Sequence, residues 1–415
     1  MVFPRYESYK PAKSKWLNEV PSHWKLLPGM AILKENKVRN IGMVEEVVLS
    51  LSYGKVIVKP PEKLTGLVPE SFETYQVINP NDIIIRPTDL QNDQTSLRTG
   101  ISKDRGIITS AYICLRPDPA HNPTFIHYLL HAYDLLKVYY GMGSGLRQNL
   151  DFRDFKRLEL CIPPREEQDR IANFLDQKTS EIDEAIAKKQ RLIELLKEQK
   201  TILINQAVTK GLNPDVPMRD SGVEWIGEVP AHWEIKKIKA SLSNLDHRRI
   251  PLSSPERGKM IERIYDYYGA SGVIDKVDDY IFDESLILVA EDGANLVMRN
   301  LRLAFIATGK YWVNNHAHIL KPIEGDIEYL CNALECVDYN PFITGAAQPK
   351  LTKDAIKNIY LPCPPKNEQK QIAEKLSVLN QQVTDQQNLV EKEIGLLNEL
   401  KQSLIASAVT GKIKI

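Results

Sequence analysis

The sequence has few cysteines and no long apolar run. Its five cysteines are odd in number and are never spaced as CxxC, so neither a disulfide framework nor a zinc ribbon is indicated. No stretch of about 18 apolar residues occurs, and the N-terminal segment has no apolar core behind its basic residues. These absences predict a cytoplasmic protein with reduced thiols and no membrane span.

Motifs for covalent chemistry are also missing. There is no GxxxxGK[ST] loop for ATP and no Asn-Pro-Pro-aromatic loop for a base, since Asn340-Pro341-Phe342 lacks the second proline. The glycines of 141–145 follow a helix-like stretch rather than a strand, which favours a flexible turn over a methyl-donor site. Acidic pairs such as Glu291-Asp292 lack the lysine that nuclease sites of this type usually carry two residues on. We therefore predict no catalytic residue, no metal and no cofactor in this chain.

Size and charge indicate a soluble protein of at least two domains. The chain has 415 residues, of which 43% are hydrophobic and 26% charged, which is typical of folded globular domains. The formal net charge is zero, which argues against a protein that grips DNA by bulk charge alone. Lys and Arg outnumber Asp and Glu in residues 1–165, but the reverse holds in 220–365.

The most informative feature is an internal repeat. KWLNEVPSHW at 15–24 returns as EWIGEVPAHW at 224–233. PPREEQDRIA at 163–172 returns as PPKNEQKQIA at 364–373, and the AVT that ends at Thr209 returns at Thr410. Between these motifs the two copies differ almost completely. A repeated frame with a changed filling predicts two equivalent modules that do the same job on different targets. Because both copies keep the His-Trp pair among apolar neighbours, we interpret it as a structural corner rather than as two catalytic histidines.

Each copy ends in a predicted long helix. The helix starts after a Pro-Pro pair, and a straight helix from 166 to 209 would be about 65 Å long at about 1.5 Å per residue. Apolar residues recur every seven positions, as in a coiled-coil seam. The predicted seam consists of Leu175, Ile182, Lys189, Leu196 and Leu203 in the first helix and Leu376, Val383, Val390, Leu397 and Leu404 in the second. Such a stripe is buried either against its own domain or, as the equal lengths favour, in an antiparallel pair of the two helices.

The segments between the repeated motifs alternate short β-rich runs with turns and predict mixed α/β domains. We therefore expect an α/β (α+β) fold with an internal pseudo-twofold repeat. The predicted boundaries are 1–165 for the first domain, 166–210 for the central helix, 211–222 for a linker rich in Pro and Gly, 223–365 for the second domain and 366–415 for the C-terminal helix.

Two variable domains, each opening with VPxHW and closing with PPxxEQxxIA and a long helix, resemble the specificity subunit of type I restriction-modification enzymes. The resemblance covers essentially the whole chain. It implies that each variable domain is a target-recognition domain for one half of a split, asymmetric DNA site. It also implies that the helices form an antiparallel coiled coil that sets the spacing and docks two modification subunits.

In that family the chemistry belongs to the partners. Modification subunits use S-adenosylmethionine to methylate adenine, and motor-nuclease subunits use ATP and Mg to cleave unmodified DNA. Two other hypotheses stay open: a single-chain methyltransferase or nuclease with degenerate motifs, and a coiled-coil scaffold whose variable domains bind protein.

Residues that contact DNA must come from the variable part, where the family motifs give no guide. Arg, Asn and Gln in turns between strands can reach guanine and adenine edges. The candidates for base contacts are Arg86, Gln91, Asn92, Gln94 and Arg98 in the first domain and Arg248, Arg249, Asn295, Arg299, Asn300, Asn315 and His316 in the second. Arg147 and Lys350, which lie in loops near the domain ends, are candidates for phosphate contacts.

Overall fold

A computed structural model describes residues 3–12, 14, 16–60, 62, 71–93, 95–142, 149–345 and 348–415. The predicted contact residues Gln94 and Arg147 lie outside these residues. The chain forms two compact units, Met1–Gln190 with Glu391–Ile415, and Arg191–Val390. The division falls inside both long helices rather than at their ends, where we predicted the boundaries, because each half of a helix packs on the core of its own unit.

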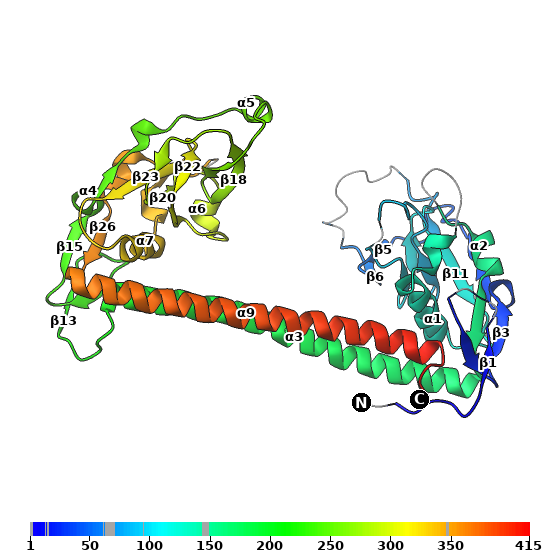
Figure 1. Cartoon of the computed structure of the whole chain (residues 1–415). Coiled ribbons are helices and arrows are strands. Elements are labelled where there is room, and N and C mark those ends of the chain that lie inside the picture. Colours follow the sequence, from blue (N-terminus) through cyan, green and yellow to red (C-terminus); the bar gives the residue numbers. More distant parts are fainter. Residues whose placement is uncertain are drawn as a thin grey trace. The chain divides into compact units, whose positions relative to one another are not determined.

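The first unit is built on a four-stranded antiparallel sheet (Figure 1). Its strand order is β4 (Leu33–Glu35), β11 (Ile113–Pro117), β8 (Ile83–Ile85), β9 (Thr99–Ile101). Strand β8 is the run Ile-Ile-Ile and is fully buried. Helix α1 (Pro123–Leu135) packs against β9. It starts where the Asn122 side chain accepts a hydrogen bond from the backbone N–H of Phe125.

Shorter elements complete the first unit. The paired strands are β1 (Tyr9–Pro11) with β2 (Glu19–Pro21), β3 (Lys25–Pro28) with β12 (Glu159–Ile162), β5 (Leu49–Ser52) with β6 (Lys55–Val58), and β7 (Gln76–Ile78) with β10 (Gly106–Ile108). The short helices are η1 (Gly29–Ala31), η3 (Val138–Gly141) and α2 (Phe152–Arg157).

The second unit repeats this sheet. Its strand order is β16 (Leu242–Asn244), β23 (Ala317–Pro322), β20 (Leu286–Ala290), β21 (Ala304–Ala307), and helix α7 (Ile327–Cys336) packs against β21. A second sheet has no counterpart of the same order among the described residues of the first unit. It consists of β18 (Gly272–Val277), β17 (Tyr265–Gly269), β22 (Lys310–Val313) and β19 (Phe282–Asp283).

Paired strands and short helices again surround the sheets of the second unit. The pairs are β13 (Met218–Asp220) with β14 (Glu228–Pro230), β15 (Glu234–Lys237) with β26 (Tyr360–Cys363), and β24 (Ile343–Thr344) with β25 (Lys350–Leu351). The short helices are α4 (Ile238–Ser241), η4 (Asp246–Arg248), α5 (Ser254–Gly258), α6 (Asn295–Met298), η5 (Asn340–Phe342) and α8 (Lys353–Asn358).

The predicted linker 211–222 is not only a linker. It contains β13, which pairs with β14 as β1 pairs with β2 in the first copy. The second repeat therefore begins before residue 223. The prediction was wrong here because a three-residue strand is defined by its pairing partner and not by a pattern of its own.

The long helices are α3 (Arg165–Lys210) and α9 (Lys366–Val409). In the first unit Ile171 and Leu175 of α3 share a core with Leu404 and Val409 of α9. In the second unit the C-terminal part of α3 shares a core with the N-terminal part of α9. Within each unit the two helices are therefore antiparallel neighbours (Figure 1). No helix in the described part of the chain is both long and apolar enough to cross a membrane.

Most of the predicted seam is at least partly buried. The buried members are Leu175, Ile182, Leu376, Val383, Val390 and Leu404, and the partly buried ones are Lys189, Leu196 and Leu397. Leu203 is 37% exposed, and its neighbour Ile204 is buried instead, so the prediction for Leu203 is wrong. A straight helix drifts against a strict seven-residue repeat, and this end of α3 packs on the core of the second unit as well as on α9.

Candidate nucleic-acid interface

The two repeated motifs meet in space. In the first unit the Glu167 carboxylate, in the first turn of α3, lies 2.8 Å from His23 Nε2 and accepts a hydrogen bond from Trp24 Nε1 at 3.1 Å. In the second unit Glu368, in the first turn of α9, binds His232 at 2.7 Å and Trp233 at 2.9 Å. We call each His-Trp-Glu group a clasp. The clasps hold the first turn of each long helix to the start of its domain, so the interpretation of the His-Trp pair as a structural corner is confirmed.

The first clasp is the more buried of the two. Glu167 also accepts a hydrogen bond from the Tyr6 hydroxyl at 2.5 Å, and its side chain is 7% exposed, compared with 36% for Glu368. Burial alone would raise the pKa of Glu167, but the hydrogen bonds from Tyr6, His23 and Trp24 outweigh it and lower the pKa.

The glutamine that follows each clasp glutamate makes the same two hydrogen bonds in both copies. Gln168 Nε2 donates to the Pro163 carbonyl, and its Oε1 accepts from the backbone N–H of Asn122 at the start of α1. Gln369 makes the same two contacts, with the Pro364 carbonyl and with the N–H of Asp326 at the start of α7. The motif PPxxEQ therefore joins three elements in each copy.

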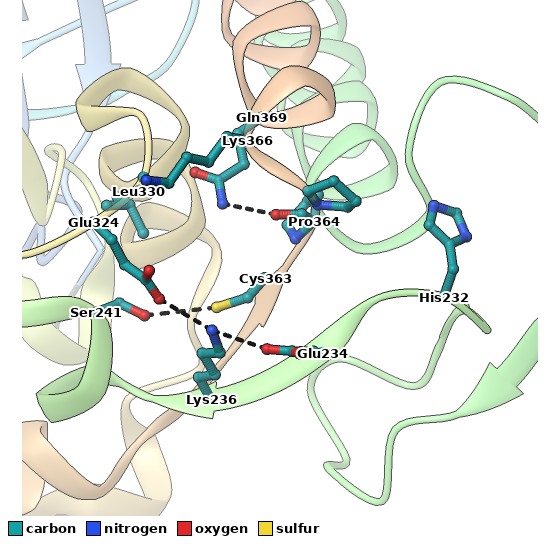
Figure 2. Close-up of a pocket in the computed structure, with 12 residues that line it drawn as sticks. His232, Glu234, Lys236, Ser241, Glu324, Leu330, Cys363, Pro364, Lys366 and Gln369 are labelled. Carbon is teal, nitrogen blue, oxygen red and sulfur yellow. Dashed lines mark hydrogen bonds and ion pairs between the residues drawn. The ribbon is translucent and has the colours of Figure 1, made fainter.

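A pocket lies beside the second clasp (Figure 2). Lys236 crosses it between Glu234 and Glu324, at 2.8 and 3.0 Å, so its charge is balanced. Cys363 Sγ lies 3.7 Å from Ser241 Oγ. Burial raises the pKa of the Cys363 thiol, so this group is not a thiolate at neutral pH.

Away from the clasps, loops converge at one edge of the sheet in each unit, which we call the loop edge. In the first unit it comprises 86–93, 95–98, 109–112 and 149–150, and in the second unit 291–303, 314–316 and 348–351. The loops 86–98 and 291–303 join equivalent strands, β8 to β9 and β20 to β21. Matching hydrogen bonds close both edges, from Leu150 N to the Pro87 carbonyl and from Leu351 N to the Glu291 carbonyl.

Of the contact residues predicted in the first unit, Arg86, Gln91 and Asn92 lie on its loop edge, and Arg98 requires a correction. Gln91 and Asn92 are exposed, Asn92 donates to Asp89, and Arg86 pairs with Asp93 at 3.2 Å. Arg98 is fully buried and donates to the backbone carbonyls of a bend in its own loop, those of Arg86, Thr88, Asp89 and Asp93. A buried guanidinium has no surface to offer DNA, so Arg98 is a structural residue of the loop.

The loop edge of the second unit brings Asn315, His316 and Lys350 together around Glu291 and Asp292. Asn315 and His316 are exposed in the turn before β23. His316 Nδ1 lies 2.9 and 2.8 Å from the two carboxylate oxygens of Asp292, which leaves Nε2 for another partner. Asn295 binds both backbone groups of Leu301 and so closes its own loop.

The arginines predicted as contacts in the second unit are mostly used within it. Arg248 binds Glu284 at 3.2 Å and the Ile281 carbonyl, which lie before β20 and away from the loop edge. Arg299 donates to the carbonyls of Val337 and Glu335. Arg249 binds Glu291, and its side chain is 15% exposed. The exposed Asn300 lies 3.9 Å from the sulfur of Met298.

The family model for the type I restriction modification DNA specificity domain matches residues 53–195 and 230–394. These two stretches include both loop edges and the greater part of both long helices. The chain belongs to the family of type I restriction-modification specificity subunits. The two matched stretches correspond to the two repeats, so each copy of the frame carries one specificity domain.

Relatives support this assignment to the specificity family. The chain is 25% identical over 379 residues to a type I restriction enzyme specificity subunit of Methanocaldococcus jannaschii, over 82% of this chain and 80% of the relative. It is 34% identical over 114 residues to a putative type I restriction enzyme specificity subunit of Haemophilus influenzae, but over only 27% of this chain and 29% of the relative. A chain solved in a study of complex assembly and conformational transition of the type I R-M system has the same fold, with a TM-score of 0.69 at 13% identity over 95% of this chain and 99% of that one.

Sequence reasoning found the loops of the specificity domains but missed their acidic residues. Glu291 and Asp292 were weighed as a metal site and set aside, yet they hold Arg249, Lys350 and His316 in place. The sequence held a sign of this role, because two acidic residues directly follow the apolar run that forms the buried strand β20. Glu167 and Glu368 were recognised as members of a repeated motif, but their contacts with the His-Trp pairs were not predicted.

Proposed function

We propose that this chain is the non-catalytic, sequence-reading subunit of a type I restriction-modification complex, with each domain reading one half of a split, asymmetric DNA site. One observation carries the proposal: a duplicated frame of clasps and helices presents the same loop edge twice, with different polar side chains each time. Equivalent loops with different donors and acceptors suit two different base sequences.

The charge at the loop edges suits reading of bases better than bulk attraction. Arg86, Arg249 and Lys350 are each paired with an acidic group, and the chain has no net charge. Base discrimination requires fixed donors and acceptors, whereas the phosphate contacts that dominate affinity require free cations. We propose that partner subunits supply much of the phosphate contact.

The duplicated helices fit two copies of one partner. Leu195 and Leu396 occupy matched positions of the repeat and are 45% and 55% exposed. Two equivalent apolar positions suit two identical modification subunits, which would bring S-adenosylmethionine and methylate adenine. Motor-nuclease subunits would add ATP- and Mg-dependent cleavage. On this proposal the chain itself holds no cofactor.

The test is single-molecule mapping of methylated bases in DNA from cells that express this chain with its modification subunit. A split motif that disappears when the chain is deleted supports the proposal. Methylation that is unchanged by the deletion refutes it. Methylation by the purified chain alone would show a single-chain methyltransferase, and no binding to any duplex with modification subunits present would favour a protein-binding scaffold.

Two further changes test the division of labour. Exchange of residues 1–165 for those of a relative should change one half of the motif and leave the other, and a change in both halves contradicts separate reading. Insertion of residues at Gln190 of α3, with a compensating insertion at the facing part of α9, should change the spacer between the halves. An unchanged spacer contradicts a ruler made of helices.

A further inference from the structure

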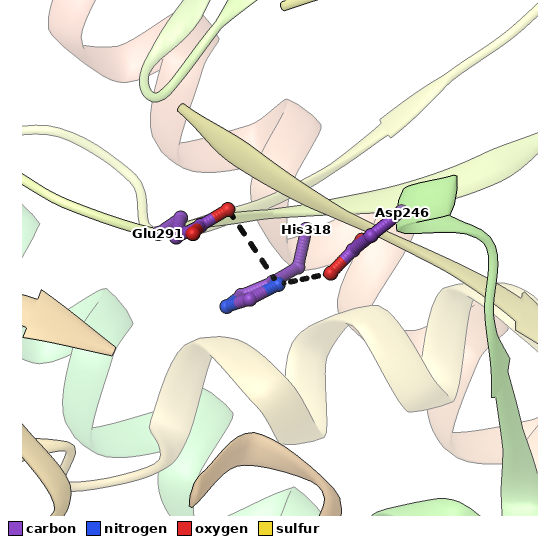
Figure 3. A group of neighbouring side chains, drawn as sticks. All are labelled: Asp246, Glu291 and His318. Atoms are coloured by element: carbon purple, nitrogen blue, oxygen red, sulfur yellow. Dashed lines mark hydrogen bonds and ion pairs between the residues drawn. The ribbon is translucent and has the colours of Figure 1, made fainter. Parts of the chain in front are cut away.

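A buried ionic network lies behind the loop edge of the second unit (Figure 3). His318, in β23, is fully buried, and its Nδ1 lies 2.7 Å from Asp246 Oδ2 and 3.9 Å from Glu291 Oε2. Arg249 binds Glu291 and lies 3.7 Å from Asp246, and Lys350 lies 3.3 Å from Glu291. These are the charged groups that face His318, from η4, from the loop after β20 and from β25.

Both ring nitrogens of His318 face acceptors. Nε2 lies 2.8 Å from the Leu351 carbonyl, which can only accept, so Nε2 carries a proton. Nδ1 faces the Asp246 carboxylate, whose other oxygen accepts from the N–H of Ile319. Although burial opposes it, the hydrogen bond from His318 helps to lower the pKa of Asp246 to about 2, so this carboxyl is ionised. The ring of His318 therefore links the Asp246 carboxylate to the Leu351 carbonyl.

The network is not a metal site in this arrangement. Two carboxylates and a histidine suit a divalent cation, but Arg249 and Lys350 already balance the charge of Asp246 and Glu291. A divalent cation would have to displace the guanidinium of Arg249 and break the contact between His318 and Asp246. The protein's own cations occupy the place that a metal would need.

The fold itself does not require this network. His318 pairs with Val289 in the sheet, and the equivalent position in the first unit is Ile113, which pairs with Ile85. Ile113 is a buried apolar residue, so the same sheet forms without a polar side chain at this position. The clasps occur in both copies, but the position of His318 is occupied by Ile113 in the first copy. The network therefore belongs to the segments that differ between the copies and not to the repeated motifs.

The network joins the segments that form the loop edge. Arg249 Nη1 donates to the carbonyls of Ala317 at 2.8 Å and Asn315 at 3.3 Å, on either side of His316. Glu291 directly precedes Asp292, which holds the His316 ring. The Leu351 carbonyl that His318 binds follows Lys350 directly. The network therefore holds the backbone at or next to Asn315, His316 and Lys350.

We infer that His318 and Arg249 are positioning residues for base recognition by the second domain: their network with Asp246 and Glu291 fixes Asn315 and the Asp292-His316 pair against the DNA. This inference rests on the proposed function. It assigns no DNA contact to His318. The buried charges give the edge one geometry, because a carboxylate or guanidinium left unpaired in the interior is strongly unfavourable.

The test uses the full chain assembled with its modification subunit, and maps methylated motifs for His318→Gln and Arg249→Lys. His318→Gln keeps a donor toward the Leu351 carbonyl but loses the charged bond to Asp246. Arg249→Lys keeps the charge but loses the bidentate geometry that holds the 315–317 turn. Ile113→Val, at the matched position of the first domain, is the control.

We expect both network variants to relax base identity in one half-site only, with about a tenfold loss of discrimination for each contact that is loosened. The other half-site and the motif of Ile113→Val should stay unchanged. If one variant fails to assemble with the modification subunit, the other variant still tests the inference. His318→Gln keeps the contact with the Leu351 carbonyl, and Arg249→Lys keeps the positive charge.

Unchanged motifs from both folded variants would overturn the inference, as would relaxation of both halves together. A wild-type complex without any split motif would instead refute the proposed function. The two failures are distinguishable because the second appears before any residue is changed.

Discussion

The clasps allow a comparison of the same substitution at two sites in one molecule. Glu167→Gln and Glu368→Gln each remove one negative charge and keep the shape of the side chain. Glu167 accepts from three donors with a side chain that is 7% exposed, whereas Glu368 has two partners and a side chain that is 36% exposed. In both clasps the glutamine amide loses the charge that strengthens the hydrogen bonds from the neighbouring donors.

Hydrogen bonds to charged groups each contribute about 1.5–3 kcal/mol when buried, and exposed ion pairs contribute about 1 kcal/mol or less. We therefore expect Glu167→Gln to lower the free energy of unfolding by about 2–3 kcal/mol and Glu368→Gln by about 1 kcal/mol. For units of this size, 1 kcal/mol corresponds to a shift in Tm of roughly 2–4 °C. The first substitution should lower Tm by roughly 4–12 °C and the second by roughly 2–4 °C.

The assay is thermal unfolding of the full chain, at neutral pH and again in acid. The pKa of Glu167 is lowered in the folded state, so its contribution to stability is complete above the ordinary glutamate pKa of about 4.3 and is lost as pH falls below it. The difference in Tm between wild type and Glu167→Gln should therefore shrink in acid. An equal or larger effect of Glu368→Gln at neutral pH would refute the reasoning from burial and donors. Tyr6→Phe, which removes one donor from the first clasp only, should have an intermediate effect.

Three further predictions concern the helices and the first domain. Lys189 interrupts the seam and binds Glu393 at 2.5 Å with both side chains partly exposed. Lys189→Leu should leave the free energy of unfolding unchanged or raise it by up to about 1 kcal/mol, whereas Lys189→Glu should lower it. A clear loss of stability in the leucine variant, measured by thermal unfolding, would show that the ion pair outweighs apolar contact. Burial raises the pKa of Asp134 to about 6, and its Oδ1 has no hydrogen-bond partner among the described residues. Ionisation of this carboxyl therefore costs stability as pH rises from about 4 to 6, and Asp134→Asn should raise stability by about 2 kcal/mol above pH 6 and by little below pH 4, which urea unfolding at the two pH values checks. Leu195→Asp and Leu396→Asp should each remove one of two bound modification subunits without lowering Tm, and native mass spectrometry that still shows two subunits in either variant would contradict docking at these positions.

The frame of the fold could be predicted because it is written twice. The helices α3 and α9 begin at Arg165 and Lys366, at or within one residue of the prediction, since Pro-Pro pairs and seven-residue spacing are local signals. The clasps could not be predicted in the same way, because His23 and Glu167 are far apart in sequence and nothing local indicates that they meet.

Predictions for single contact residues depended on exposure, which residue type does not reveal. Asn315 and His316 lie on the loop edge and are exposed, whereas Arg98 has the same chemistry as other candidates and is buried among carbonyls of its own loop. An arginine between strands serves equally well to hold a bend or to read a base. Only the path of the backbone decides between the two.

The His-Trp-Glu contacts that the two clasps share have an evolutionary consequence. Recombination between the repeated motifs can replace a whole domain while the junction stays the same, provided that the incoming segment begins with the His-Trp pair and ends in Pro-Pro before the Glu-Gln turn. The new domain then inherits a working attachment in a single event. On the proposed function, selection is then left to act on the side chains of the loop edge.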